Sequence, residues 1–289
     1  MCGVALSIHI PYLKGDELML LPLITLLSAV ITVLFYVFNA VSQLYWLPVV
    51  FAASFTALFL CFLIFLFICT RFINTKQKCV KHSPFYRACA DVVMDFTAKC
   101  LRIKLHVSGM ELLPSEKFLL VGNHRGAMDP LLTMNLLRNY NMGFVAKKIV
   151  FKIPIISRLM HKCFCLSLDR ESSRKDLKTI TEAIRLIKSQ TASIGIYPEG
   201  TRNPTDELLP FMHGAFKIAK KAECPIVVAA VYNTETVMKN APLHKTDVHL
   251  DFIGVLDKDF VNENSTLQIS EKVRDMINEK LIQRRNNSV

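Results

Sequence analysis

Residues 118–130 read Phe-Leu-Leu-Val-Gly-Asn-His-Arg-Gly-Ala-Met-Asp-Pro. The apolar residues at the start predict a short buried strand, and the polar residues that follow predict a turn leading into a helix. Strand ends of this kind are where α/β proteins place reactive side chains. The stretch therefore predicts an α/β domain with a functional site at this strand end.

Two residues of this turn, His124 and Asp129, can meet only if the backbone folds back between them. Gly126 gives the turn flexibility, and Pro130 suits the first position of the next helix, which would make Asp129 its N-cap. A carboxylate beside a histidine fixes the imidazole tautomer and prepares a general base. The same two residues also fit a helix cap and a surface side chain, so the rest of the chain has to decide between these interpretations.

The composition indicates which classes of partner the protein can bind. The chain has 289 residues, enough for one large domain or two small ones, and a net charge of +11. Such a charge favours a polyanionic partner, which can be nucleic acid, an anionic membrane or a phosphorylated substrate. The hydrophobic residues are concentrated near the N-terminus, which favours membrane lipids and phosphorylated substrates over nucleic acid. Nine cysteines without paired spacing indicate reduced thiols in a protein that faces the cytosol.

Two runs without charge, residues 18–38 and 44–70, are each long enough for a membrane-spanning helix. They predict a helical hairpin over residues 1–75, followed by a catalytic domain over 76–289. The positive residues after the second run place that domain on the cytoplasmic side; they are Arg71, Lys76, Lys78, Lys81 and Arg87. A signal peptide and a hairpin confined to one leaflet are the alternatives.

After the hairpin, apolar strand-like runs alternate with helical patterns. This alternation predicts an α/β domain with a mostly parallel sheet and flanking helices. The expected strands are 103–107, 117–121, 143–146, 165–168, 193–197, 225–232 and 248–255, and the expected helices include 84–101, 214–223 and 267–284. Residues 147–162 mix lysines with isoleucines, which fits either a surface that rests on anionic lipid or an ordinary amphipathic helix broken at Pro154.

Three of the expected strands end in unusual polar sets: 123–129, Asp169-Arg170 and residues 199–202, Glu-Gly-Thr-Arg. In a mostly parallel sheet such ends can converge at one edge. The site would then combine a base, its carboxylate and two arginines, which are well matched to a phosphate. Thr201 and the backbone around Gly200 could add hydrogen-bond donors.

Other chemistries lack their motifs. The sequence contains no G-x-S-x-G elbow, no phosphate-binding G-x-x-x-x-G-K-[ST] loop and no H-E-x-x-H helix. His124 and Asp129 could ligate a metal, but no third ligand has a matching spacing, so we expect none. Without a protein nucleophile, a base of this kind would deprotonate a substrate hydroxyl. A hydroxyl of a phosphorylated lipid that attacks an activated acyl group fits the base, the arginines and the hairpin together.

The residues that carry this prediction also resemble a known family. Residues 123–129 resemble the N-H-x-x-x-x-D motif of the glycerolipid acyltransferases, and residues 197–202 resemble their F-P-E-G-T-R motif, with Tyr197 in place of Phe. Residues 147–170 and 224–227 resemble two further blocks of that family. The resemblance covers roughly residues 104–255, and the lysophosphatidic acid acyltransferases are its nearest members.

The resemblance implies a function and a set of site residues. His124 would be the general base and Asp129 would orient it. The substrate-binding residues would be Asn123, Lys147, Arg170, Glu199, Gly200, Thr201 and Arg202. The implied reaction transfers an acyl group from acyl-CoA or acyl-carrier protein to lysophosphatidic acid, giving phosphatidic acid, with no cofactor. The alternatives are another lysophospholipid or glycerol 3-phosphate as acceptor, a catalytically silent lipid-binding protein, and a membrane hydrolase with water as acceptor.

Overall fold

A computed structural model describes residues 20–38, 40–41, 43–75, 77–168, 173–205 and 207–286. These residues divide into two compact units: one ends at Gln77, and the other comprises the described chain from Lys78 onward. Asp169 and Arg170 lie outside the described residues.

The first unit contains two helices, α1 (Leu20–Val37) and α2 (Leu47–Arg71), which are long and apolar enough to cross a membrane. The residues that α1 buries are Ile24, Ser28 and Thr32, every fourth residue along one stripe. The hydroxyls of Ser28 and Thr32 donate to backbone carbonyls one turn earlier. Their polar groups are therefore satisfied within the helix, as a hydrocarbon environment requires. The predicted pair of apolar helices is confirmed.

The second unit is built on one seven-stranded sheet in the order β1-β7-β6-β2-β5-β3-β4. All neighbouring strands pair in parallel except β6 with β7, so the predicted mostly parallel sheet is confirmed. The strands are β1 (Ile103–Ser108), β2 (Leu119–Gly122), β3 (Gly143–Lys147), β4 (Leu166–Leu168), β5 (Ile194–Ile196), β6 (Ile226–Tyr232) and β7 (Thr246–Leu256).

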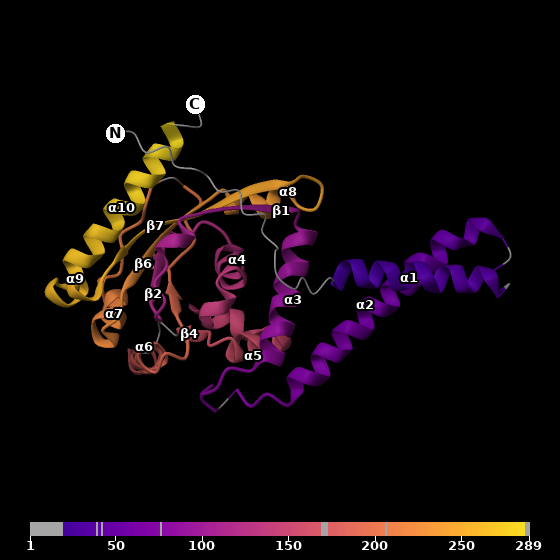
Figure 1. Cartoon of the computed structure of the whole chain (residues 1–289), viewed down its shortest axis with the longest axis horizontal. Helices are drawn as coiled ribbons and strands as arrows, with labels where there is room; N and C mark the ends of the chain where they lie inside the picture. Colours follow the sequence, from indigo (N-terminus) through magenta and orange to yellow (C-terminus); the bar gives the residue numbers. More distant parts are fainter. Residues whose placement is uncertain are drawn as a thin grey trace. The chain divides into compact units, whose positions relative to one another are not determined.

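Helices cover both faces of this sheet, giving three layers (Figure 1). One face packs against α3 (Pro84–Cys100), α4 (Asp129–Leu136) and α8 (Val237–Asn240), and α5 (Pro154–Lys162) packs beside α3. The other face packs against α6 (Ser173–Lys188), α7 (Lys217–Ala222), α9 (Lys258–Glu263) and α10 (Thr266–Asn286). The strands at the centre are buried on both sides, because every residue of β2 and β6 is buried.

Three helices differ from the sequence prediction. The helix expected over 214–223 begins as a 3₁₀ turn, His213–Phe216, and becomes α7 only at Lys217. The short helix α8 was not predicted, and neither was α9. The start of α9 is capped by Asp257, whose Oδ1 accepts the Phe260 N–H at 2.8 Å, so a local capping signal was present in the sequence.

Candidate active site

The candidate site lies where three adjacent strands, β6, β2 and β5, end at the same edge of the sheet. The turn after β2 and the turn after β5 touch directly, since the backbone N–H of His124 donates to Glu199 Oε1 at 2.9 Å. The predicted convergence of these two polar sets is confirmed. The third set, Asp169-Arg170, follows β4 and falls in the undescribed residues 169–172.

His124 and Asp129 form the expected pair, with 2.7 Å between His124 Nδ1 and Asp129 Oδ2. The same Oδ2 accepts the backbone N–H groups of Arg125 at 2.8 Å and Gly126 at 2.9 Å. The side chain of Asp129 is fully buried, whereas that of His124 is 18% exposed. Nδ1 is thus held by a buried carboxylate, and among the described residues no hydrogen bond engages Nε2 of the imidazole.

Asp129 does not cap its helix in the way the sequence suggested. Helix α4 begins at Asp129 itself, with Met128 as the preceding N-cap residue. The carboxylate turns back to the loop before the helix and accepts from Arg125 and Gly126 rather than from the first turn of α4. The residue therefore organises the His124 turn, which an N-cap alone would not do.

Gly126 is required for close packing rather than for a special backbone angle. A Cβ added there would lie 2.6 Å from the carbonyl oxygen of Thr234 and 2.9 Å from its Cβ. Thr234 belongs to the turn after β6, so Gly126 allows the loops after β2 and β6 to touch. This reason differs from the flexibility that the sequence suggested.

Tyr197 lies flat against the imidazole. Its ring centroid is 4.3 Å from that of His124, with an angle of 8° between the planes, and Phe144 stacks with Tyr197 at 5.2 Å. Burial, together with the nearby Asp129 carboxylate, holds the pKa of Tyr197 well above its ordinary value, so the phenol is neutral. The Asp129 hydrogen bond and the Tyr197 ring together fix both the direction and the plane of the His124 ring.

We expect Tyr197→Leu to lower kcat about tenfold, because losing the aromatic contact, worth about 0.5–1.5 kcal/mol, frees the imidazole plane. Tyr197→Phe keeps the ring that faces His124 and should stay within about threefold of the parent. Steady-state kinetics of the two variants test this. Equal activities for the leucine and phenylalanine variants would contradict a positioning role for the ring.

Glu199 is a structural centre of the site and is only 5% exposed. Besides the His124 N–H, its carboxylate accepts the backbone N–H of Leu209 at 3.1 Å and the Asn203 side chain at 3.3 Å, both on Oε2. Gly200, with φ of 70°, occupies the left-handed region where glycine is favoured. The carboxylate of Glu199 is thus engaged by the protein's own N–H groups, which assigns it to holding the loop rather than to contacting substrate.

Asn123 likewise joins two strands. Its side chain accepts the Val231 N–H at 2.8 Å and donates to the Val231 carbonyl at 2.9 Å, and the residue is 2% exposed. The side chain therefore extends the β2–β6 pairing by one further rung. The amide of Asn123 is therefore already engaged by the backbone of β6.

The remaining expected site residues are open to solvent. Lys147, at the end of β3, and Thr201 and Arg202, in the turn after β5, are exposed. Within the described residues, no hydrogen bond or ion pair engages the Lys147 ammonium or the Arg202 guanidinium. Lys147 ends β3, and Arg202 lies in the turn after the neighbouring strand β5. Two exposed positive charges therefore lie at the ends of adjacent strands, at the edge where His124 lies.

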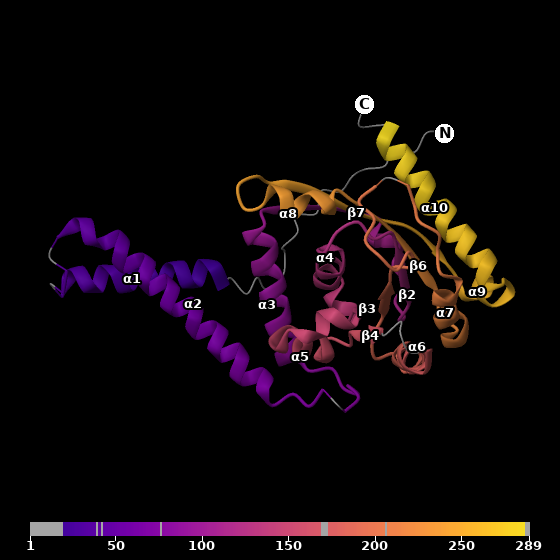
Figure 2. The same ribbon diagram turned by 180° about the vertical axis from the view of Figure 1, so that it is seen from behind.

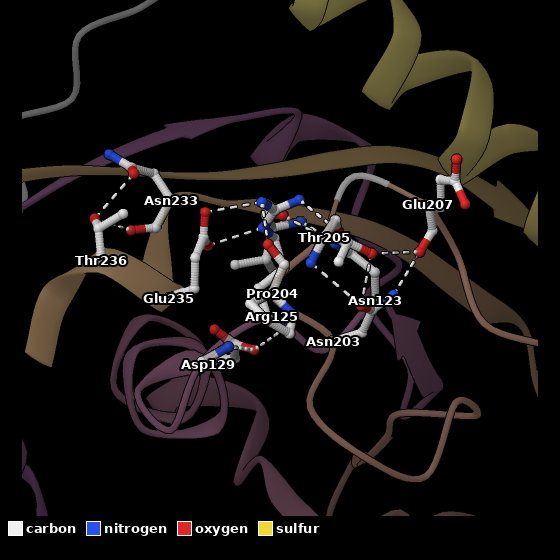
Figure 3. Close-up of polar contacts among 12 residues, drawn as sticks. Asn123, Arg125, Asp129, Asn203, Pro204, Thr205, Glu207, Asn233, Glu235 and Thr236 are labelled. Atoms are coloured by element: carbon white, nitrogen blue, oxygen red, sulfur yellow. Dashed lines mark hydrogen bonds and ion pairs between the residues drawn. The ribbon is translucent and has the colours of Figure 1, made fainter. Parts of the chain in front are cut away.

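The sequence did not predict a buried ion pair that lies beside this turn. Arg125 is paired with Glu235 through two contacts of 2.8 Å, Nε to Oε2 and Nη2 to Oε1 (Figure 3). The guanidinium also donates to the carbonyls of Pro204 and Thr205, at 3.2 Å each. Arg125 therefore links the loops after β2, β5 and β6. The only sequence signal for the pair was a charged residue, Glu235, shortly after a buried strand.

Asn203 completes the same network from the loop after β5. Its backbone N–H donates to the His124 carbonyl at 2.7 Å, and its side chain accepts from the Thr205 hydroxyl at 2.7 Å and donates to the Glu207 carbonyl. The His124 turn is thus held on both sides by protein groups. Among the described residues, no cluster of three His, Cys, Asp or Glu side chains could hold a metal ion.

Comparison with known proteins agrees with this arrangement. Residues 104–232 match the family model described as Acyltransferase. It is 25% identical over 193 residues to a Saccharomyces cerevisiae protein named 1-acyl-sn-glycerol-3-phosphate acyltransferase, covering 63% of each chain. It is 32% identical over 126 residues to a Caenorhabditis elegans protein named putative 1-acyl-sn-glycerol-3-phosphate acyltransferase, covering 43% of this chain and 48% of that one.

A solved structure shares the fold. The crystal structure of the 1-acyl-sn-glycerophosphate (LPA) acyltransferase from Thermotoga maritima superposes with a TM-score of 0.56 at 18% identity, covering 91% of this chain and 97% of that one. The matched region spans about three fifths of the length of the yeast relative and about half of the nematode relative.

Proposed function

We propose that the protein transfers a fatty acyl group from a thioester donor to the free hydroxyl of lysophosphatidic acid, giving phosphatidic acid. The observation that carries this proposal is the His124–Asp129 pair, with Nδ1 bound to a buried carboxylate and Nε2 left available. The relatives named 1-acyl-sn-glycerol-3-phosphate acyltransferases support the same reaction.

In this mechanism Nε2 of His124 takes the proton of the acceptor hydroxyl as its oxygen attacks the carbonyl carbon of the thioester. The new ester C–O bond forms, the C–S bond breaks, and the departing thiolate takes the proton back from the imidazolium. Asp129 stabilises the imidazolium through the 2.7 Å contact to Nδ1. No acyl-enzyme is needed, and the donor, acyl-CoA or acyl-carrier protein, is a co-substrate rather than a cofactor.

The acceptor phosphate would bind the exposed cations of the same edge, Lys147 and Arg202, with Thr201 adding a hydroxyl. Arg170 is proposed as a further phosphate ligand on the family resemblance alone. Glu199 and Asn123 would act by holding the loops, since their side chains are already occupied.

We also propose that α1 and α2 anchor the protein in the membrane and that the catalytic unit faces the cytoplasm. The length and composition of the two helices support the anchor. The basic residues that follow α2 support the orientation, because positive charges near membrane spans favour the cytoplasmic side.

The test is acyl transfer from labelled acyl-CoA to lysophosphatidic acid by the purified chain, with His124→Ala beside it. His124→Ala should lower the rate by about 10²–10⁴-fold. The matched control is His244→Ala, at an exposed histidine outside the site, and it should keep full activity. If the protein acylates glycerol 3-phosphate or another lysolipid in preference to lysophosphatidic acid, the acceptor in the proposal changes. Acyl-CoA consumption without any acceptor would indicate a hydrolase. No turnover with either donor would favour a silent lipid-binding protein, and a fully active His124→Ala would overturn the base.

A further inference from the structure

The segment after β3 exposes an unusual set of apolar side chains. It comprises a 3₁₀ turn, Lys148–Lys152, and helix α5, which begins at Pro154. The exposed members are Ile149 (59%), Ile153 (51%), Ile156 (40%) and Val150 (39%). An ordinary amphipathic helix would turn such residues inward. Here the inward positions are already filled by other side chains of the segment.

The inward side chains show how the segment is attached. Leu159 of α5 is buried, and Phe151 and Met160 pack against the core beneath α3 and α4. Figure 2 shows α5 beside α3, with α10 on the opposite side of the sheet. The isoleucines are thus held outward on a rigid support. We call the four exposed apolar residues, together with Lys148 and Lys152, the α5 surface.

The charge of the α5 surface identifies its partner. Lys148 and Lys152 are exposed on either side of Ile149 and Val150. Lysines that interleave with exposed apolar residues are typical of segments that lie at the interface of an anionic bilayer. The surface is also continuous with the candidate active site, because Lys148 directly follows Lys147 at the end of β3.

We propose that the α5 surface docks on an anionic lipid bilayer, as a membrane contact of the catalytic unit separate from helices α1 and α2. The isoleucines would enter the boundary between headgroups and acyl chains, and the lysines would lie at the level of the lipid phosphates. A lipid acceptor could then pass from the bilayer to the neighbouring strand ends without crossing water.

The first test measures depth by fluorescence quenching. The chain has one tryptophan, Trp46, so Trp46→Phe provides a background without signal. Ile153→Trp in that background reports on the α5 surface. Leu267→Trp is the matched control, because Leu267 is 47% exposed on α10, which covers the opposite face of the sheet. The full-length variants are reconstituted into vesicles of brominated phosphatidylcholine and phosphatidylglycerol in which Trp46 of the parent chain is quenched.

We expect bromine to quench the tryptophan at 153 and to leave the one at 267 unquenched. Replacing phosphatidylglycerol with phosphatidylcholine, or adding salt, should reduce the quenching, because the lysines contribute through screened charge. If the tryptophan is quenched at neither position, the proposal is overturned. An emission shift at 153 on adding an acidic acyl-carrier protein, without quenching by lipid, would overturn it in favour of docking of a protein donor.

A second test rests on the proposed function. Ile149→Ser and Ile153→Ser should each weaken docking by roughly fivefold, which raises the apparent KM for a long-chain acceptor presented in vesicles. Their kinetics with a short-chain, water-soluble acceptor should equal those of the parent. Loss with both acceptors would show damage to the site and contradict a docking role. An inactive parent would refute the acyltransferase proposal while leaving the quenching result valid.

Discussion

Asp129→Asn should lower kcat by roughly 10²–10⁴-fold while leaving the KM for the acceptor close to that of the parent. The asparagine oxygen can still accept the N–H groups of Arg125 and Gly126, so the turn keeps its shape. It carries no charge, however, and cannot stabilise an imidazolium at His124. Because the Asp129 side chain is fully buried, its replacement removes no contact with substrate, which is why KM should not change.

Asp129→Asn should also lower the stability of the protein, because of the second carboxylate oxygen, Oδ1. Oδ1 is buried and has no hydrogen-bond partner in the described part of the chain. An asparagine NH₂ placed there would be a buried donor without an acceptor, which destabilises by about 1–3 kcal/mol. Thermal unfolding in detergent measures this effect separately from kcat. Asp259→Asn, the same change at an exposed residue of α9, is the control. A variant at position 129 with more than a tenth of the parent kcat would contradict the proposed mechanism.

The strands could be predicted because a fully buried strand leaves a direct signal in the sequence. The apolar run at 225–232 and the observed β6, Ile226–Tyr232, differ by one residue. The order of the strands could not be predicted in this way. β1 pairs with β7, the last strand of the chain, and β7 runs antiparallel to β6. The apolar pattern of a strand does not indicate which other strand will lie beside it in the sheet.

The same limit explains which contacts of the site could be predicted. His124 and Asp129 are five residues apart, so their contact depends on one local turn. Asn123 binds Val231, a residue more than a hundred positions away, and its role depends on β2 lying next to β6. The Asn123–Val231 contact could therefore not be predicted. Arg125 was passed over for the same reason, because its partner Glu235 reaches it only through that strand pairing.

Glu235→Leu should have the largest effect on stability, a loss of about 3 kcal/mol in the free energy of unfolding. It would leave the guanidinium of Arg125, whose side chain is 7% exposed, buried without its carboxylate. For a domain of this size, such a loss lowers the unfolding temperature by about 6–12 °C. Glu223→Gln breaks an ion pair in which both side chains are about half exposed or more and should change the free energy by less than about 0.5 kcal/mol.

The double variant Arg125→Met, Glu235→Leu separates stability from positioning. It removes the buried guanidinium that Glu235→Leu deprives of the Glu235 carboxylate, so part of the lost stability should return. The hydrogen bonds from Arg125 to the Pro204 and Thr205 carbonyls are absent in this variant, so the loop after β5 loses its attachment to residue 125 and kcat should stay low. If the double variant regained activity along with stability, Arg125 would serve only to neutralise Glu235. If Glu235→Leu unfolded at the temperature of the parent, the pair would not hold the three loops together.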